Sequence, residues 1–164
     1  MSNDGPPGFV VDASVSLKWV LPEPHAAESG HLRAAQEAGA ITLHVPELWL
    51  VEVGNALWAR TRRGGPLRLT RQDARRALAA LGSAGLRRHG HGQLAPLSIV
   101  LACDTGITLY DATYLALAVR EESPRVTADE RLVANVRKAG LTDYVFALRD
   151  VGRTLVNVSA GTEG

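Results

Sequence analysis

Cysteine is nearly absent from this sequence and long apolar runs are missing, and these shortages exclude several classes of protein. The 164 residues include one cysteine, Cys103, so neither an internal disulfide nor a site built from several thiolates can form. A reducing compartment, the cytoplasm, is therefore expected. No run approaches the roughly 18 apolar residues that cross a bilayer. Residues 1–8 lack the basic start and apolar centre of a signal peptide, so we expect no membrane association.

Net charge is also small, yet the charges are unevenly distributed. The net charge is only +1, and 46% hydrophobic with 21% charged residues excludes a disordered or collagen-like chain. Nine of the 18 Lys and Arg residues lie between Arg60 and Arg88, where only Asp73 opposes them. This segment is either a solvated helix surface or a basic face that binds a polyanion, and the sequence leaves both interpretations open.

Short β-branched runs alternate with helical segments along the chain. This alternation is typical of an α/β fold, and we predict a three-layer α/β/α sandwich with a mainly parallel sheet of four to five strands. Residues 1–150 would form a single domain, followed by a loose tail at 151–164. Glycines at 82, 85, 90 and 92 predict an irregular loop over residues 82–96. Strands are predicted at 9–11, 41–45, 125–127 and 144–148, and helices at 24–38, 46–63, 70–81, 96–102, 112–121 and 129–139.

Acidic residues follow the predicted strands at the edge where parallel strands end. Asp12 ends the first strand, Asp129 follows the third, and Asp111 begins a helix, so all three are expected at one edge. Glu52 lies in a helix that is apolar on nearly every face. Such a helix is normally buried, and a buried carboxylate needs a cationic partner. Four converging carboxylates favour a divalent cation, Mg²⁺ or Mn²⁺, which would support metal-assisted hydrolysis of a phosphodiester.

Helix capping is the competing explanation for these acids. Asp12 is a preferred N-cap residue. Capping accounts fully for Asp73, and it accounts for Asp111 as well as metal binding does. Glu130 can complete the cap of its helix, which would leave Asp129 free to bind a ligand. The pairs with capping-box spacing are Thr70/Asp73, Thr108/Asp111 and Thr127/Glu130.

The histidines form no recognisable motif. His89 and His91 share the predicted glycine-rich loop and could bind a metal or a phosphate. Two imidazoles without a third ligand favour exposed loop residues instead. No serine or cysteine is paired with a general-base histidine, so covalent catalysis is not indicated.

Four segments carry a resemblance to a known family. They are residues 10–15, 46–57, 109–118 and 126–132, which read VVDASV, PELWLVEVGNAL, LYDATYLALA and VTADERL. They resemble the motifs of PIN-domain ribonucleases, and in particular the VapC-type toxin branch. One motif alone is weak, whereas the four together are specific. The resemblance extends from residue 9 to about residue 148.

The resemblance implies a metal-dependent endoribonuclease that hydrolyses RNA with a metal-bound water. Ser14, Asn55 and Thr127 match polar positions that would orient carboxylates or waters. The acids that match the Mg²⁺- or Mn²⁺-binding pocket are Asp12, Glu52, Asp111 and Asp129.

The resemblance also implies partners. Family members usually form homodimers and are neutralised by a small antitoxin protein that places a segment over the active site. The basic segment would hold the phosphates of the RNA substrate, which positions RNA without reading its sequence. The candidate RNA contacts are Arg60, Arg62, Arg63, Arg71 and Arg75.

Three other functions are compatible with parts of the pattern. A non-catalytic RNA- or partner-binding module could keep the same fold. A phosphoaspartyl phosphatase would need a second Asp two residues after Asp12, where Ser14 stands. A receiver-like signalling domain would need adjacent early acids and a late lysine, and Lys18 and Lys138 do not fit that pattern.

Overall fold

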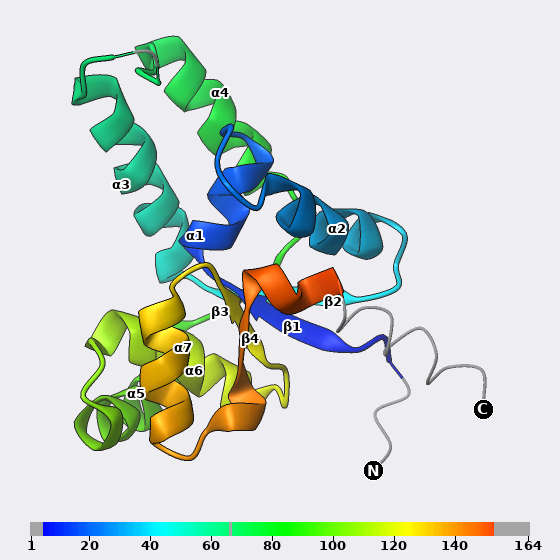
Figure 1. Cartoon of the computed structure of the whole chain (residues 1–164), viewed down its shortest axis with the longest axis vertical. Helices are drawn as coiled ribbons and strands as arrows, with labels where there is room; N and C mark the ends of the chain where they lie inside the picture. The colour runs from blue at the N-terminus through cyan, green and yellow to red at the C-terminus, as the bar shows by residue number, and fades with distance from the viewer. Residues whose placement is uncertain (1–4, 66, 153–164) are drawn as a thin grey trace.

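A five-stranded parallel sheet forms the centre of the protein (Figure 1). The computed structural model describes residues 5–65 and 67–152. The strand order is β3-β2-β1-β4-β5, and every neighbouring pair is parallel. From β1 the chain continues to β2 on one side, and from β4 it continues to β5 on the other side. In open parallel sheets, ligands bind where the strand order reverses in this way, which here is at the ends of β1 and β4. The strands are β1 (Gly8–Val11), β2 (Thr42–Pro46), β3 (Arg87–His89), β4 (Arg125–Thr127) and β5 (Val145–Ala147).

Helices cover both faces of the sheet, which confirms the predicted sandwich. The short α1 (Ala13–Ser16) and α2 (Ala26–Glu37) lie on one face. The other face carries α5 (His91–Thr105), α6 (Leu109–Arg120) and α7 (Glu130–Lys138). Single 3-10 turns occur at Leu17–Trp19, Thr142–Tyr144 and Leu148–Asp150.

Two helices extend away from the sheet as an antiparallel pair (Figure 1). They are α3 (Leu48–Arg62) and α4 (Arg71–Gly82). The expectation that the helix carrying Glu52 is buried, because it is apolar on nearly every face, is wrong: Val51 is 74% exposed and Trp58 is 56% exposed. Burial of Trp49, Val53 and Leu57 accounts for one face of α3 only.

The first strand is buried on both sides, as its continuous apolar run predicts. Phe9, Val10 and Val11 all lie in the core between the two helix layers. Among the described residues, no single helix has the length and apolar character to cross a membrane, and α5 and α6 meet those criteria only jointly, with a bend of 114°. From residue 153 on, the predicted tail lies outside the described residues, and it stays a prediction.

The predicted loop over residues 82–96 is wrong. Two elements occupy it: β3, and the start of α5 at His91. Pro96 lies inside α5 instead of beginning a helix there. Among the described strands, β3 is an edge strand that pairs only with β2, and its sequence Arg-Arg-His carries no apolar alternation from which a strand could be predicted.

Candidate active site

The turn from β1 into α1 fixes the side chain of Asp12. Asp12 is the N-cap of α1, and its Oδ1 accepts a hydrogen bond from the Val15 amide at 3.2 Å. The Ser14 hydroxyl donates to the same oxygen at 2.5 Å. The residue is only 5% exposed. Capping therefore occurs, but it uses only one carboxylate oxygen and leaves Oδ2 for another partner.

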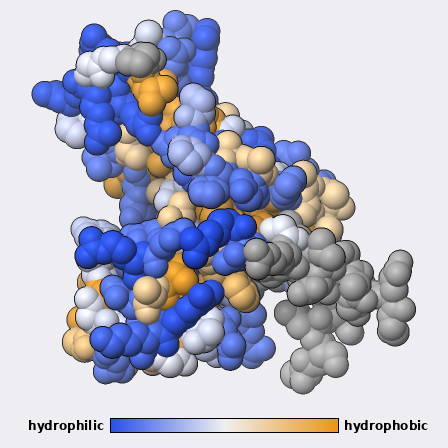
Figure 2. All heavy atoms as spheres, in the orientation of Figure 1, coloured by the Kyte–Doolittle hydropathy of each residue, from blue (hydrophilic) through white to orange (hydrophobic). Residues whose placement is uncertain are grey.

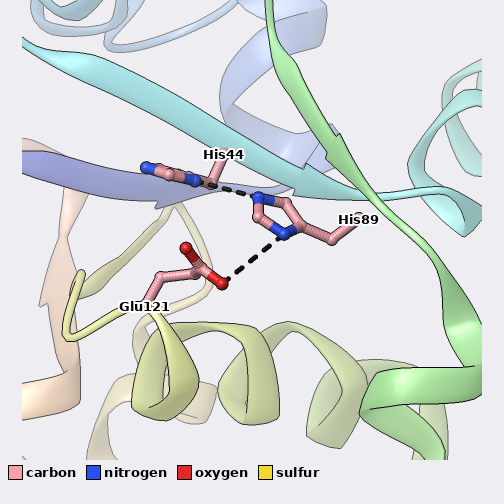
Figure 3. A group of neighbouring side chains, drawn as sticks. All are labelled: His44, His89 and Glu121. Atoms are coloured by element: carbon pink, nitrogen blue, oxygen red, sulfur yellow. Dashed lines mark hydrogen bonds and ion pairs between the residues drawn. The ribbon is translucent and has the colours of Figure 1, made fainter.

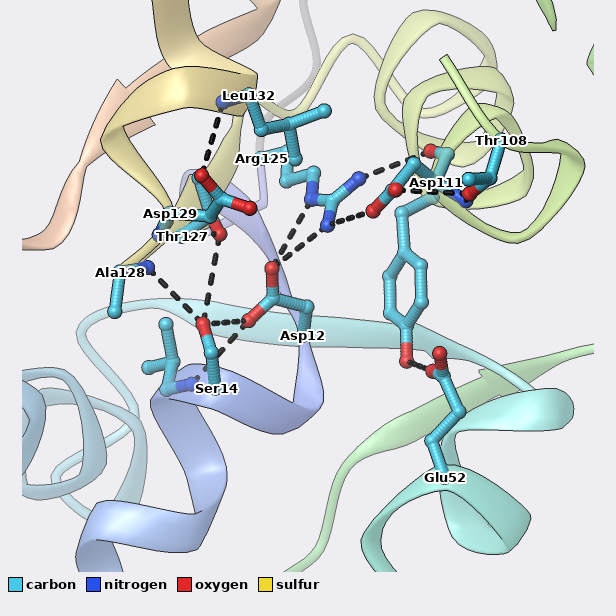
Figure 4. A network of polar contacts seen from close by, with 12 residues as sticks. Asp12, Ser14, Glu52, Thr108, Asp111, Arg125, Thr127, Ala128, Asp129 and Leu132 are labelled. Atoms are coloured by element: carbon cyan, nitrogen blue, oxygen red, sulfur yellow. Dashed lines mark hydrogen bonds and ion pairs between the residues drawn. The ribbon is translucent and has the colours of Figure 1, made fainter. Parts of the chain in front are cut away.

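That partner is a buried arginine, which the sequence reasoning missed (Figure 4). Nη2 of Arg125 in β4 donates to Asp12 Oδ2 at 2.8 Å and to Asp111 Oδ1 at 2.9 Å. Its Nη1 donates to the Asp111 carbonyl at 2.9 Å. Burial lowers the pKa of Arg125, but the carboxylates of Asp12 and Asp111 outweigh burial and raise it overall, so the guanidinium stays charged. A charged residue inside a buried strand requires a partner of opposite charge, and this requirement could have indicated from the sequence that Arg125 pairs with the acids.

Asp111 has two roles at the start of α6. Its amide donates to the Thr108 hydroxyl at 3.1 Å, and that hydroxyl donates to Oδ2 at 2.9 Å, which forms the predicted capping interaction. Its other oxygen, Oδ1, faces Arg125. Asp111 therefore caps α6 and also belongs to the candidate active site. At Asp73, which pairs with Thr70 in the same way, capping is the only interaction of the side chain among the described contacts.

Glu52 reaches the site from α3 and meets a tyrosine. The Tyr114 hydroxyl donates to Glu52 Oε2, and the guanidinium of Arg125 lies over the Tyr114 ring at 4.8 Å. Burial raises the pKa of Glu52 and the charge of Asp12 adds to this, while the hydrogen bond from Tyr114 lowers it. Glu52 is half-buried, and its direct partner is a hydroxyl where a cation was expected.

Asp129 caps α7, which contradicts the expectation that Glu130 would take this role. Its Oδ1 accepts from the amides of Arg131 and Leu132, both at 3.0 Å. Glu130 pairs instead with Arg149. The physical reason is position: Asp129 has the extended backbone of an N-cap, whereas Glu130 is already the first helical residue. The cap uses only Oδ1 of Asp129.

Two hydroxyl groups connect the ends of β1 and β4. Ser14 Oγ accepts from the Ala128 amide at 3.0 Å and lies 3.5 Å from the Thr127 hydroxyl oxygen. Thr127 is fully buried and accepts from the Asp129 amide at 3.2 Å. Ser14 therefore links the Asp12 carboxylate to the loop that carries Asp129.

The four acids share one cavity of about 180 Å³, called the acidic cavity below. Asn55 is exposed, does not line this cavity, and is not brought to the site. The acids are spread around the cavity. Among the described residues, only one set of three side chains has possible metal-ligand atoms within 4.8 Å of one another. That set lies outside the acidic cavity. The acidic cavity is lined by Asp12, Glu52, Asp111 and Asp129, together with Ser14, Thr127, Tyr114 and Arg125.

The donors of the acidic cavity fit a hard divalent cation. Carboxylate and hydroxyl oxygens are the ligands that Mg²⁺ and Mn²⁺ prefer. Asp12 and Asp111 already converge on a single nitrogen of Arg125, so the guanidinium supplies the positive charge that these acids require. Ion binding by this pair would take over part of that role.

The predicted RNA contacts divide into two groups. Arg62, Arg71 and Arg75 line a cleft of about 720 Å³ between α3 and α4, called the α3–α4 cleft below. Arg62 lies over the Trp58 ring at 5.3 Å. Arg60 instead pairs with Glu23, which also binds Lys18 at 3.2 Å. Arg63 is exposed at the end of α3 and does not line the cleft.

Comparisons with known proteins agree with the geometry. The family described as PIN domain matches residues 9–138. The chain is 34% identical over 127 residues to the protein named Ribonuclease VapC3 from Pyrobaculum aerophilum. The matched region covers 76% of this chain and 91% of that relative. Among solved structures, the crystal structure of PAE2754 from Pyrobaculum aerophilum is similar, with a TM-score of 0.64, 25% sequence identity, and coverage of 98% of this chain and 96% of that one.

Proposed function

The chain belongs to the PIN-domain family, and on that basis we propose that it is a metal-dependent endoribonuclease that hydrolyses phosphodiester bonds in RNA. The observation that carries the proposal is the acidic cavity. Four acids line it: Asp12 directly after β1, Glu52 in α3, Asp111 in α6, and Asp129 between β4 and α7. Asp12 and Asp129 lie where strands of the parallel sheet end. The similarity to a protein named as a ribonuclease supports RNA as the substrate.

The proposed metal ligands are Asp12, Glu52, Asp111 and Asp129. When bound, a Mg²⁺ or Mn²⁺ ion supplies a water of lowered pKa and neutralises charge on the phosphodiester. Ser14 holds Oδ1 of Asp12, which leaves Oδ2 to accept from Arg125. Tyr114 orients Glu52 by its hydrogen bond, and burial raises the pKa of that hydroxyl so that it remains a donor.

The α3–α4 cleft is the proposed path for the RNA backbone. Its arginines carry positive charge, and the surface over this end of the molecule is largely hydrophilic with a small apolar patch (Figure 2). Arg62 is ten residues beyond Glu52 on α3, about 15 Å along the helix axis. One RNA strand can therefore contact the cleft while a phosphodiester lies in the acidic cavity. Phosphate contacts of this kind position RNA without sequence preference.

The proposed biological role is that of the toxin in a toxin–antitoxin pair, acting in the cytoplasm. The similarity to Ribonuclease VapC3 supports this role. The partner would be a small antitoxin that covers the acidic cavity and neutralises it. Co-expression with the gene product encoded next to this one should abolish RNA cleavage, and loss of that inhibition after removal of the partner's terminal segment would identify the covering part.

We also propose a homodimer through an exposed apolar face. Ile99, Leu109 and Tyr110 are each more than half exposed and line a groove of about 430 Å³ next to Leu48. A second copy of the chain would remove this surface from water. Light scattering should give the mass of a dimer for the intact chain and of a monomer for Tyr110→Glu. A monomeric intact chain would contradict this assembly.

The test of the enzymatic proposal uses circular RNA, which only an endonuclease can linearise. Cleavage should require Mg²⁺ or Mn²⁺ and stop in EDTA. Asp111→Asn should abolish it, whereas Asp73→Asn should not, because both acids cap a helix in the same way and only Asp111 faces the cavity. RNA binding without cleavage by the intact chain would instead indicate a non-catalytic module.

A further inference from the structure

A second group of side chains with metal-ligand chemistry lies outside the acidic cavity (Figure 3). His44 from β2, His89 from β3 and Glu121 at the end of α6 each place one possible ligand atom within 4.8 Å of the others. Nδ1 of His44 lies 3.0 Å from Nε2 of His89. Nδ1 of His89 lies 3.6 Å from Oε1 of Glu121. These residues are distant in sequence, and the fold brings them together.

The surroundings select the nitrogen of His44 that can bind a ligand. A Cβ atom placed at Gly8 would lie 2.9 Å from Nε2 of His44 and 2.1 Å from the Ser123 hydroxyl oxygen. Nε2 therefore faces the closely packed start of β1, where no ion fits. The other nitrogen, Nδ1, faces His89. His44 is 5% exposed, so its ring cannot turn toward solvent to avoid this arrangement.

The distance between the two imidazole nitrogens suits a shared ion as well as a shared proton. Two Zn–N bonds of roughly 2.0–2.1 Å at a tetrahedral angle separate their nitrogens by about 3.3 Å. The observed separation of 3.0 Å is close to this value. An ion could replace the shared proton with a small displacement of the rings. The Glu121 carboxylate, which is partly exposed, then turns from Nδ1 of His89 to the ion.

Both imidazoles are in the state that a metal requires. Burial lowers the pKa of His44 to about 4, with a further contribution from His89, and burial also lowers the pKa of His89. Neutral imidazole is the form that binds metal ions, so no proton has to be removed from a charged histidine near neutral pH.

We propose that His44, His89 and Glu121 bind one divalent transition-metal ion, and that this ion is zinc. Two imidazole nitrogens and one carboxylate form a ligand set that zinc uses, with a water in the fourth position. Mg²⁺ prefers oxygen ligands and is not expected here. The site is separate from the acidic cavity, because Glu121 is ten residues beyond Asp111 along α6, about 15 Å.

Two arginines near the proposed site carry positive charge, which repels a metal ion and lowers the affinity of the site for it. Arg120 Nε lies 3.6 Å from Glu121 Oε1, and Arg87 adds positive charge near both histidines. Arg120 is 41% exposed, so it can move into solvent when the carboxylate turns to the metal. Removal of its charge should tighten binding, a result that a merely structural role of Glu121 would not produce.

The ion would fix the edge strand to the rest of the fold. Within the described part of the chain, the three-residue β3 pairs only with β2, and its first two residues are exposed. Coordination would tie β3 and β2 to the end of α6 at one point. Zinc should therefore raise the thermal stability of the protein, because a ligand that binds only the folded state stabilises that state.

The test is metal binding by the full chain in excess Mg²⁺, which competes with zinc for the carboxylates of the acidic cavity. Zinc affinity is measured by competition with a chelating dye, and Co²⁺ is used as a probe because a site with nitrogen ligands gives it visible absorption bands. The intact chain should bind one zinc ion. His89→Gln and Glu121→Gln should each weaken zinc binding by roughly 10- to 100-fold or more. This range is the loss in metal affinity when a residue that only supports a ligand is replaced, and loss of a ligand itself should cost at least as much. Arg120→Gln should bind zinc more tightly.

Two controls locate the ion. His91→Gln changes an exposed histidine two residues from His89 and should bind zinc like the intact chain. Asp12→Asn should also retain zinc. Absence of zinc binding by the intact chain, or binding lost in Asp12→Asn and kept in Glu121→Gln, would overturn the proposal. The readout is zinc binding and not RNA cleavage, so the outcome does not depend on the proposed nuclease function.

Discussion

Replacement of Arg125 by methionine tests the electrostatics of the acidic cavity. The side chain is 4% exposed and that of Asp12 is 7% exposed, so the substitution leaves a buried carboxylate without its cation. Removal of one partner from a buried ion pair destabilises a protein by about 3–5 kcal/mol. Asp111, whose side chain is 36% exposed, can be solvated and adds less. We therefore expect Arg125→Met to lower the free energy of unfolding by about 3–5 kcal/mol in EDTA.

Magnesium should restore part of this loss. In Arg125→Met, Asp12 and Asp111 have no guanidinium between them, so a divalent cation becomes their only source of positive charge. Urea unfolding in EDTA and in MgCl₂ measures the effect. The stability gained from Mg²⁺ should be larger in Arg125→Met than in the intact chain.

The matched control is Arg149→Met, which breaks the exposed pair between Arg149 and Glu130. Both side chains are more than half exposed, so only a small loss and no specific response to Mg²⁺ are expected. The reasoning is refuted if Arg125→Met loses no more stability than Arg149→Met, or if its deficit is the same with and without Mg²⁺.

Three further predictions follow from single contacts. Tyr114→Phe removes the hydrogen bond that lowers the pKa of Glu52, so this pKa should rise. The acidic limb of the pH–rate profile for RNA cleavage should therefore move to higher pH, and an unchanged limb would contradict the role of Tyr114 as the partner of Glu52. The pKa of His44 is about 4 in the folded protein against 6.5 for the free group, so the unfolded chain binds the extra proton between these values. Stability should fall by about 3 kcal/mol as the pH falls through this window, and urea titrations of His44→Gln should show a shallower pH dependence. Arg62→Ala should weaken RNA binding equally for unrelated sequences and reduce its salt dependence, whereas Arg60→Ala should not, because Arg60 is paired with Glu23; equal losses in filter binding would contradict the assignment of the α3–α4 cleft.

Residues with a local signal could be predicted from the sequence. The apolar run before Asp12 predicts a buried strand, and the rule that ligands bind where parallel strands end places Asp12 and Asp129 together. The Thr-x-x-Asp spacing predicts the cap at Asp111, which the structure contains. The alternation of strands and helices is sufficient for the α/β/α sandwich.

Residues that act through distant partners could not be predicted. β3 consists of two arginines and a histidine, and its strand conformation comes from pairing with β2. Arg125 lies 113 residues from Asp12, so no spacing rule connects them. The nearness of His44 and His89 depends on the register between β2 and β3, in which Pro46 pairs with His89 and thereby places His44 and His89 on the same face.

The most direct test of the central claim is RNA cleavage by purified Asp12→Asn in Mg²⁺. Asparagine keeps an N-cap acceptor for α1, and Arg125 keeps its bonds to Asp111, so circular dichroism and thermal unfolding should show a folded protein. The account predicts that this folded variant cleaves RNA no faster than the intact chain does in EDTA. Cleavage by folded Asp12→Asn at the rate of the intact chain would contradict it.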